Sequence, residues 1–285
     1  MNPATVKEWL FYGKTILKDI GIESYFIDAE ILLMTALNFT KTELFTKDNY
    51  ILTKDETDKY KNFLNKRKNF MPVQYIIEKC EFMGLEFRVN PSTLIPRNDT
   101  EILVEYAINY IKENNCKTVL DIGTGSGAIA VSVAYYCPDI KAVAVDISEK
   151  ALNTAKENAK INNVSERIDF IKSDIFENIT EKYDIIISNP PYIQSDIIKT
   201  LIPQVKDYEP LSALDGGKDG LYFYKKIISE CKNYINKNGA LLFEIGYNQS
   251  FEVSELLSEK GFGEIKTTKD YAGLDRVVSS VYKQI

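Results

Sequence analysis

The sequence predicts an α/β protein in which a doubly wound, mostly parallel sheet follows a small all-helical N-terminal domain. Three observations lead to this fold class. Residues 1–75 show only the helical spacing of apolar side chains, whereas strand and helix patterns alternate from residue 117 onward. The last two strand patterns follow one another with a turn at Gly273 and no full helix between them, which indicates an antiparallel C-terminal hairpin.

The first domain, residues 1–75, is expected to contain four or five helices. Thr53 and Glu56 have the spacing of a capping box, and the helix that they open carries Tyr60 and Phe63 at helical spacing. Ser24 is expected to cap an earlier helix. One basic cluster has two interpretations, a solvated helix face or a docking patch for an acidic or RNA-containing partner: Lys59, Lys61, Lys66, Arg67 and Lys68.

A linker, residues 76–97, joins the first domain to the second, residues 98–285. Apolar side chains alternate from Phe82 to Asn90 around Gly84, a pattern typical of a β-hairpin. Asn98 begins a polar, acidic stretch that suits a helix N-terminus, so we expect a helix running to about Glu113.

The second domain alternates between strands and helices. We expect strands at 118–122, 142–146, 168–172, 183–188 and 240–245, helices at 127–137, 148–162 and 220–236, and a final pair of strands at 264–268 and 276–282. Strands that alternate with helices form a parallel sheet with helices on both faces.

The composition excludes several classes of chemistry. The chain has no histidine, which rules out a Ser-His-Asp triad, a Cys-His pair and a histidine zinc site. Its four cysteines form no CxxC pair, so we expect no metal, and scattered thiols are typical of a cytoplasmic protein. The N-terminus does not have the pattern of a signal peptide, and no apolar run is long enough to span a membrane.

The charge distribution argues against DNA as a substrate. The whole net charge of −6 lies after residue 85, in the half of the chain that carries the strand motifs. A protein whose affinity depends on phosphate neutralisation needs a large basic surface. We therefore expect no direct nucleic-acid substrate. The protein is also expected to have no membrane partner and to be a monomer.

A glycine-rich loop follows the first strand of the second domain: Asp121, Gly123, Thr124, Gly125, Ser126 and Gly127. Its glycines permit a tight turn and let a ligand approach the backbone. Asp146 ends the next strand, where a carboxylate accepts both hydroxyls of a ribose. The loop therefore predicts a nucleoside ligand, although Gly123, Gly125 and Ala128 also fit the dinucleotide pattern.

Asp121 favours S-adenosylmethionine over a dinucleotide. A carboxylate just before the glycines would repel a pyrophosphate, whereas it suits the ammonium group of a methionine moiety. Asp174, at the end of the third strand, is a candidate acceptor for the adenine amine, with a solvent-facing strand end as the alternative.

The tetrapeptide Asn189-Pro190-Pro191-Tyr192 ends the fourth strand. Its two prolines fix the backbone, so the Pro190 carbonyl is held rigidly. The Asn189 side-chain oxygen is a second acceptor, and two fixed acceptors suit one planar NH₂ group. Tyr192 supplies a face on which such a group stacks.

The stretch from Asp121 to Tyr192 resembles the class I methyltransferases that modify planar nitrogen. Further motifs are similar to the HemK-type release-factor glutamine methyltransferases: residues 72–76, 93–101, 209–211, 216–220, 244–246 and 270–276. Asn98 departs from the family, which usually has proline there, but both residues suit a helix start. The run Asp99-Thr100-Glu101 favours this family over the sister family that methylates a ribosomal protein.

The resemblance implies a seven-stranded sheet and methyl transfer from S-adenosylmethionine, without a metal, to the glutamine amide of a Gly-Gly-Gln loop. The partner would be a peptide-chain release factor, and the reaction would affect translation termination. The helical domain would recognise that substrate. Asn189, Pro190 and Tyr192 would be catalytic, Asn189 would also contact the cofactor, and substrate contacts would add Pro191, Arg97, Thr100 and Glu101.

Other functions remain open at this point. A DNA adenine methyltransferase and a ribosomal-protein glutamine methyltransferase both share the tetrapeptide. A non-catalytic S-adenosylmethionine- or nucleotide-binding module, or an NAD oxidoreductase, needs only the loop. Because histidine is absent, we also expect no imidazole-type limb in the pH profile between pH 6 and 8.

Overall fold

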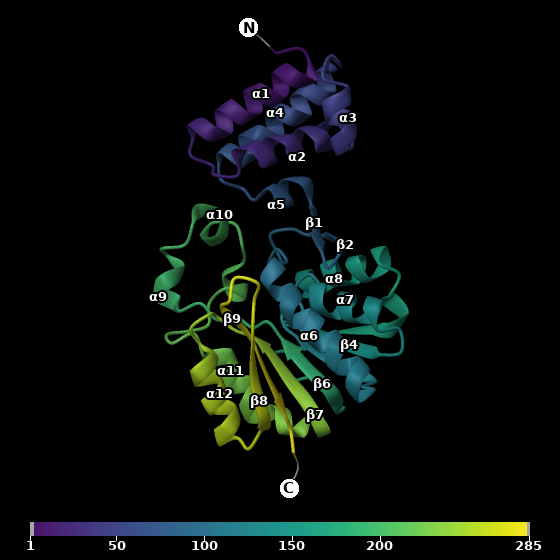
Figure 1. Ribbon diagram of the computed structural model, residues 1–285, viewed down its shortest axis with the longest axis vertical. Helices are drawn as coiled ribbons and strands as arrows, with labels where there is room; N and C mark the ends of the chain where they lie inside the picture. The colour runs from purple at the N-terminus through teal and green to yellow at the C-terminus, as the bar shows by residue number, and fades with distance from the viewer. Residues whose placement is uncertain (1–2, 284–285) are drawn as a thin grey trace. The chain divides into compact units, whose positions relative to one another are not determined.

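The computed structural model describes residues 3–283, which form two compact units. The helical unit contains the residues up to Glu78 together with a later segment, Ile202–Tyr208. The sheet unit contains Lys79–Leu201 and the residues from Glu209 onward. Figure 1 shows both units.

The helical unit has five helices before residue 79: α1 (Val6–Asp19), α2 (Tyr25–Leu37), α3 (Lys41–Thr46), α4 (Lys54–Lys68) and α5 (Val73–Ile77). The capping box predicted at Thr53 is confirmed, and Thr5 and Thr40 form two more. Ser24 precedes α2 as expected, but its hydroxyl caps no backbone group and instead donates to Asp28 Oδ2 at 2.8 Å.

Arg67 corrects the expectation of a uniformly solvated basic face on α4. The side chain is 4% exposed, and its Nε donates to Asp28 Oδ2 at 2.7 Å. Its Nη2 donates to Gln204 Oε1 at 3.2 Å, in α10 (Pro203–Lys206), and Tyr208 Oη donates to the Asn69 carbonyl at 2.5 Å. These contacts attach the segment Ile202–Tyr208 to the helical unit.

The sheet unit begins with a hairpin, β1 (Lys79–Phe82) and β2 (Leu85–Arg88), as predicted around Gly84. Seven strands follow in the main sheet: β3 (Thr118–Ile122), β4 (Lys141–Asp146), β5 (Ile168–Lys172), β6 (Tyr183–Ser188), β7 (Ile235–Glu244), β8 (Gly263–Lys269) and β9 (Asp275–Val281). Their order is β5-β4-β3-β6-β7-β9-β8. The first five are parallel, and β9 and β8 are antiparallel to their neighbours.

Helices cover both faces of this sheet (Figure 1). On one face, α6 (Asn98–Asn114), α7 (Ala128–Tyr136) and α8 (Glu149–Ile161) pack against Val119 and Ile185; on the other, α11 (Tyr222–Glu230) and α12 (Ser250–Glu259) pack against Leu120 and Ile186. Successive strand residues therefore enter opposite cores, as the near-continuous apolar runs require. The predicted fold class is confirmed.

Three elements differ from the sequence interpretation. The helix expected at 220–236 ends at Glu230 and continues as a 3₁₀ turn, Cys231–Asn233, before β7. Helix α12 has no counterpart in the prediction, and α9 (Ser195–Ile198) is a single short turn. Within residues 3–283, no helix is both long and apolar enough to cross a membrane.

Candidate active site

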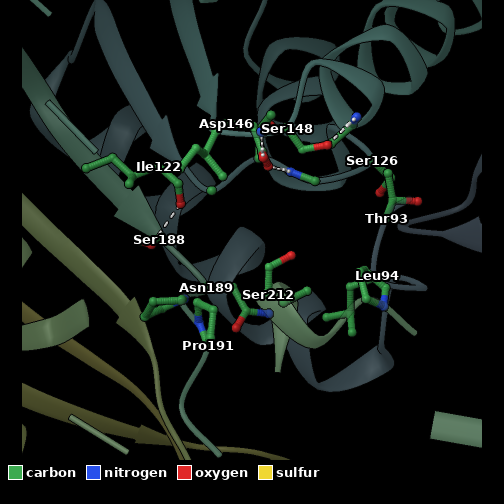
Figure 2. Close-up of a pocket in the computed structure, with 18 of the residues that line it drawn as sticks. Thr93, Leu94, Ile122, Ser126, Asp146, Ser148, Ser188, Asn189, Pro191 and Ser212 are labelled. Atoms are coloured by element: carbon green, nitrogen blue, oxygen red, sulfur yellow. Dashed lines mark hydrogen bonds between the residues drawn. The ribbon is translucent and has the colours of Figure 1, made fainter. Parts of the chain in front are cut away.

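The glycine loop and the Asn189-Pro190-Pro191-Tyr192 tetrapeptide meet at the middle of the sheet. Here the chain, after adding β4 and β5 on one side of β3, returns to add β6 on the other side. Strands β3 and β6 are parallel neighbours, with Ile122 opposite Ser188 at their carboxyl ends. Ser188 Oγ donates to the Ile122 carbonyl at 2.8 Å (Figure 2). The glycine loop and Asn189 therefore leave adjacent strands side by side, which is the usual place for a ligand site in a doubly wound sheet.

A pocket of about 310 Å³ lies at this point. Eleven of the predicted site residues line it: Arg97, Thr100, Gly123, Thr124, Gly125, Ser126, Asp146, Asp174, Asn189, Pro190 and Pro191. Four others do not: Glu101, Asp121, Gly127 and Tyr192. The sequence analysis missed the wall formed by the linker, Ser92, Thr93 and Leu94, and the apolar wall formed by Ile147, Ile175, Phe223 and Ile227.

The glycines of the loop are needed for different reasons. Gly123 and Gly125 have φ of +74° and +56°, and a Cβ at either position would meet no atom within 4 Å. Their backbone is thus open to a ligand. Gly127 has φ of +82° and begins α7, and a Cβ there would lie 3.0 Å from the Ala155 Cβ. Gly127 is therefore required for packing α7 against α8.

Asp121 lies beneath the loop rather than on the wall of the pocket. The residue is fully buried, and its Oδ2 accepts from Thr124 Oγ1 at 2.6 Å and from the Ala130 N–H at 3.2 Å. Its Oδ1 has no hydrogen-bond partner among the described residues. Burial raises the pKa of Asp121 to about 7. In this structure the carboxylate shapes the loop from below and does not line the pocket.

Asp146 and Asp174 both face the pocket. Asp146 Oδ2 accepts from the Gly125 N–H at 2.9 Å and Oδ1 from the Ser148 N–H at 2.8 Å (Figure 2). Burial raises the pKa of Asp146, although the two backbone donors oppose the shift. Asp174 Oδ2 accepts from Lys226 Nζ at 2.9 Å, a partner that the sequence did not indicate.

Asn189 is oriented by a residue that lies 89 positions earlier in the chain. Its Nδ2 donates to Thr100 Oγ1 at 3.1 Å, from the first turn of α6. Because the amide nitrogen is engaged in this way, the side-chain oxygen is left as the free acceptor. The role of Asn189 and Pro190 as a pair of acceptors for one NH₂ group stays a prediction.

The backbone of the tetrapeptide is held by a turn rich in glycine. Gly216 N–H donates to the Ile193 carbonyl at 2.8 Å. A Cβ on Gly216 would lie 2.7 Å from Tyr192 Cα, and one on Gly220 would lie 2.5 Å from the Tyr192 carbonyl oxygen. Gln249 Nε2 also donates to that carbonyl at 3.2 Å. The close approach explains the glycines of the 216–220 turn, and Gln249 is a contact that sequence reasoning missed.

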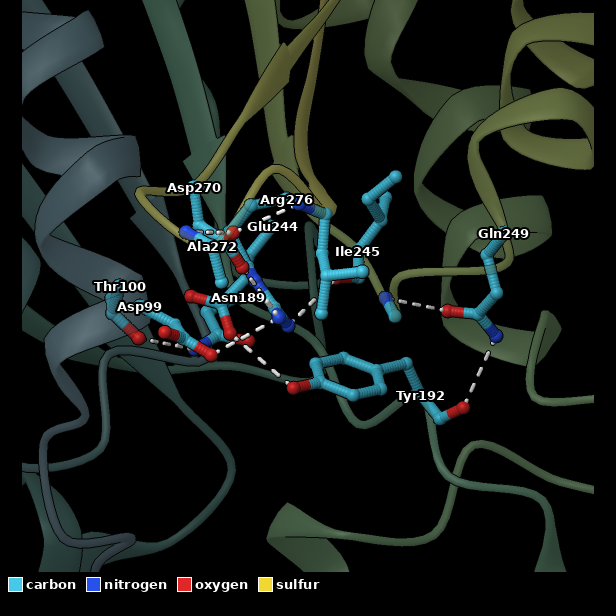
Figure 3. Close-up of polar contacts among 12 residues, drawn as sticks. Asp99, Thr100, Asn189, Tyr192, Glu244, Ile245, Gln249, Asp270, Ala272 and Arg276 are labelled. Carbon is cyan, nitrogen blue, oxygen red and sulfur yellow. Dashed lines mark hydrogen bonds and ion pairs between the residues drawn. The ribbon is translucent and has the colours of Figure 1, made fainter.

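Tyr192 does not line the pocket, and its hydroxyl donates to Glu244 Oε1 at 3.4 Å (Figure 3). Glu244 ends β7, is 2% exposed, and interacts with the Thr100 hydroxyl. Burial raises the pKa of Glu244 to about 7, while Thr100 and Arg276 oppose the shift. Glu244 is thus another buried carboxylate, besides Asp121, whose pKa is raised by burial, and the absence of an imidazole-type limb stays a prediction.

Three further ion pairs frame the site. Arg276 Nη2 lies 3.1 Å from Asp99 Oδ2 and 3.1 Å from Asp270 Oδ2, joining the C-terminal hairpin to the start of α6 (Figure 3). Arg97, on the pocket wall, donates to the buried Glu209. Glu101, predicted as a substrate contact, instead accepts from the N–H of Met83 in the hairpin turn at 2.6 Å.

The arrangement suits a nucleoside ligand and a planar nitrogen group. Asp146 and Asp174 line the pocket together with Asn189, Pro190 and Pro191. Within residues 3–283, no group of three or more His, Cys, Asp or Glu side chains is placed to hold a metal ion.

Known proteins resemble the chain along nearly its whole length. Residues 99–206 match the methyltransferase small domain, and residues 8–77 match the PrmC N-terminal domain. A release factor glutamine methyltransferase of Clostridium acetobutylicum is 43% identical over 97% of this chain and 98% of its own length. The protein of the same name from Agrobacterium fabrum is 36% identical over 97% of each chain.

Solved structures agree on the fold of the sheet unit. One of them is a T. thermophilus 16S rRNA methyltransferase in complex with AdoMet and guanosine. It superposes with a TM-score of 0.52 and 19% identity, covering 72% of this chain and 50% of that chain.

Proposed function

This chain belongs to the family of release factor glutamine methyltransferases, and we propose that it methylates the glutamine side-chain amide nitrogen in the Gly-Gly-Gln loop of peptide-chain release factors. The methyl donor in this proposal is S-adenosylmethionine. The observation that carries it is a single pocket lined both by the glycine loop and by Asn189, Pro190 and Pro191.

The residues present fit S-adenosylmethionine. Gly123 and Gly125 expose their backbone to open space, so a ligand can lie against the loop without meeting a side chain. Asp146 would bind the ribose hydroxyls, and Ile147, Ile175 and Phe223 would enclose the adenine. When bound, this donor supplies a methyl group on a positively charged sulfur, so no metal or covalent intermediate is needed.

The chain's own contribution is the positioning of a poor nucleophile. An amide nitrogen is weakly nucleophilic because its lone pair is delocalised into the carbonyl group. Asn189 Oδ1 and the Pro190 carbonyl would each accept one N–H of the substrate amide and direct the lone pair toward the methyl group. Alignment of this kind supplies up to roughly 7–11 kcal/mol in favourable cases, and acceptors fixed in advance need no reorganisation.

The acidic sheet unit favours a protein amide over a DNA base as substrate. The net charge of −6 lies after residue 85, and a duplex-binding enzyme must both neutralise phosphates and extrude its base. We infer that the helical unit recognises the release factor, because that unit contributes none of the residues that line the pocket.

Mass spectrometry tests the proposal directly. Release factor incubated with the full-length protein and S-adenosylmethionine should gain one methyl group on its Gly-Gly-Gln peptide. A release factor whose loop glutamine is changed to glutamate is the matched control and should gain none. Incorporation into adenine of duplex DNA, with the release factor unmodified, would overturn the proposal.

The variants Asn189→Ala and Asn189→Asp test the acceptor role. Removing the acceptor leaves one substrate N–H unpaired, which costs about 1–3 kcal/mol, or roughly ten- to a hundredfold in kcat/KM. Asn189→Asp keeps the oxygens, so part of the activity should survive. Full activity in Asn189→Ala would show that this side chain does not hold the substrate.

A further inference from the structure

One face of α8 carries a line of buried polar side chains that the proposed reaction does not use. Thr154, Asn158 and Asn162 are spaced four residues apart, so they lie on the same face of the helix. All three are buried, and Asn158 is 0% exposed. Buried polar side chains need hydrogen-bond partners. Helix α8 lies beside β2 (Figure 1), and the partners are found there.

Two of these side chains hold the segment 86–90, which consists of the end of β2 and the two residues after it. Asn162 Nδ2 donates to the Glu86 carbonyl at 3.0 Å. Thr154 Oγ1 accepts from Asn90 Nδ2 at 2.8 Å. The hydrogen bonds that Asn162 and Thr154 make to other elements both end in this segment. They fix the segment against α8.

Asn158, between these two, contacts the segment and the glycine loop at once. Its Oδ1 accepts from the Arg88 N–H at 2.7 Å, and its Nδ2 donates to the Arg88 carbonyl at 2.9 Å, as a neighbouring strand would. The same Nδ2 donates to the Ser126 carbonyl at 2.8 Å. Both N–H groups and the oxygen of this amide are therefore engaged. One buried side chain joins β2 to the loop that follows β3.

The segment that α8 holds leads in two directions along the chain. Toward the C-terminus it continues into Ser92, Thr93 and Leu94, which line the same pocket as Ser126. Toward the N-terminus it continues through the β1–β2 hairpin to the helical unit, whose first part ends at Glu78. Asn158 thus connects the proposed cofactor loop to the stretch of chain that leads to the proposed recognition unit.

We propose that Asn158 is a positioning residue that couples occupancy of the glycine loop to the order of the β1–β2 hairpin. A ligand that lies on the loop restrains Ser126 and, through one buried amide, Arg88. A restraint that is already present lowers the entropy cost when a second ligand binds. Release factor should therefore bind more tightly to the cofactor-loaded protein, and the effect must be reciprocal. This consequence rests on the proposed function, whereas the coupling itself concerns the loop and the hairpin.

Hydrogen–deuterium exchange of the full-length protein tests the coupling. The probe is S-adenosylhomocysteine at saturation, which lacks the methyl group and is not consumed. It should slow exchange about fivefold or more in peptides covering residues 79–88. These residues lie outside the set that lines the pocket, so contact with the probe does not explain the protection. Protection of residues 123–127 without any change in residues 79–88 would overturn the proposal, and this wild-type measurement needs no variant to fold.

Variants of α8 separate coupling from structural support. Asn158→Ala should abolish the ligand-dependent protection of the hairpin and keep that of the loop. Asn158→Asp should do the same, because it keeps an acceptor for the Arg88 N–H but places an oxygen against two carbonyls. Asn162→Ala and Thr154→Val are the matched controls, since each removes one buried hydrogen bond to the same segment. Both should raise exchange with and without the probe alike. A loss of the ligand-dependent change in Asn162→Ala equal to that in Asn158→Ala would overturn the proposal.

Calorimetry with release factor tests the consequence for binding. S-adenosylhomocysteine should lower the Kd for release factor about five- to thirtyfold in the wild type and less than about twofold in Asn158→Ala. An equal Kd with and without the probe in the wild type would overturn coupled binding.

The outcomes for the coupling and for the proposed function are distinguishable. Hairpin protection in a protein that leaves release factor unmethylated would support the coupling and refute the proposed function alone. Methylated release factor with an unprotected hairpin would refute the coupling alone. Protection of neither the loop nor the hairpin would overturn both.

Discussion

Replacing Asp146 with alanine removes two kinds of hydrogen bond at once. The carboxylate accepts from the backbone N–H groups of Gly125 and Ser148, so its loss leaves two donors of the loop unpaired in the free protein. Bonds to a charged group contribute about 1.5–3 kcal/mol each. Asp146 is only half-buried, and water in the pocket can replace it. We therefore expect a loss of about 2–3 kcal/mol in the free energy of unfolding.

The second effect of Asp146→Ala is on ligand affinity. The ribose hydroxyls of S-adenosylmethionine would lose their charged acceptor, which costs a further 1.5–3 kcal/mol, or roughly ten- to more than a hundredfold in Kd. Calorimetry measures that Kd, and urea denaturation measures the stability.

Glu149→Ala is the control for Asp146→Ala, because it removes the same charge nearby. Its side chain is 74% exposed and lies outside the pocket. It should leave the Kd unchanged. A folded Asp146→Ala protein with the wild-type Kd would refute both the assignment of the ribose subsite and the reasoning behind it.

Three other outcomes are expected. In Gly127→Ala, the new Cβ would lie 3.0 Å from Ala155 at a residue whose φ is +82°, so urea denaturation should show a free energy of unfolding lower by about 2–4 kcal/mol. Gly21→Ala is the control, because Gly21 has a φ of +80° but open space around it, and it should lower the same free energy by about 1–2 kcal/mol. Because the folded pKa of Asp121 is raised, the free energy of unfolding should fall as pH rises toward about 7 and then level off, and Asp121→Asn should flatten this fall in the same assay. Removing residues 1–70 should spare binding of S-adenosylmethionine but raise the KM for release factor; equal KM values would contradict the recognition role of the helical unit.

The fold was accessible to sequence reasoning because its signals are local. Strand β3 and strand β6 have the bounds that their apolar runs predicted, and the motif at Asn189 follows β6 directly. The pairing of parallel strands then brings distant motifs together without any further information, since their carboxyl ends share one edge of the sheet.

The orientation of side chains at the site was not accessible in the same way. Asp121 follows the rule for a ligand contact in sequence, yet it is turned beneath the loop by Thr124 and Ala130. Tyr192 turns toward Glu244, a residue 52 positions later. Contacts between residues so far apart in the sequence depend on which rotamer the packing allows. No periodicity in the sequence specifies that rotamer. The only available signal for Glu244 was its place in the Glu-Ile-Gly motif.

The segment Ile202–Tyr208 has a consequence for the order in which the chain folds. Domains generally fold as they leave the ribosome, N-terminal part first. Here the first residues to emerge lack the partners that Arg67 and Asn69 find in Gln204 and Tyr208, and the second contact spans 139 residues. By the time those partners are synthesised, strands β3 to β6 have already been made. The helical unit is thus begun first and completed only after half of the main sheet exists, so the two units mature as interleaved rather than successive folding events.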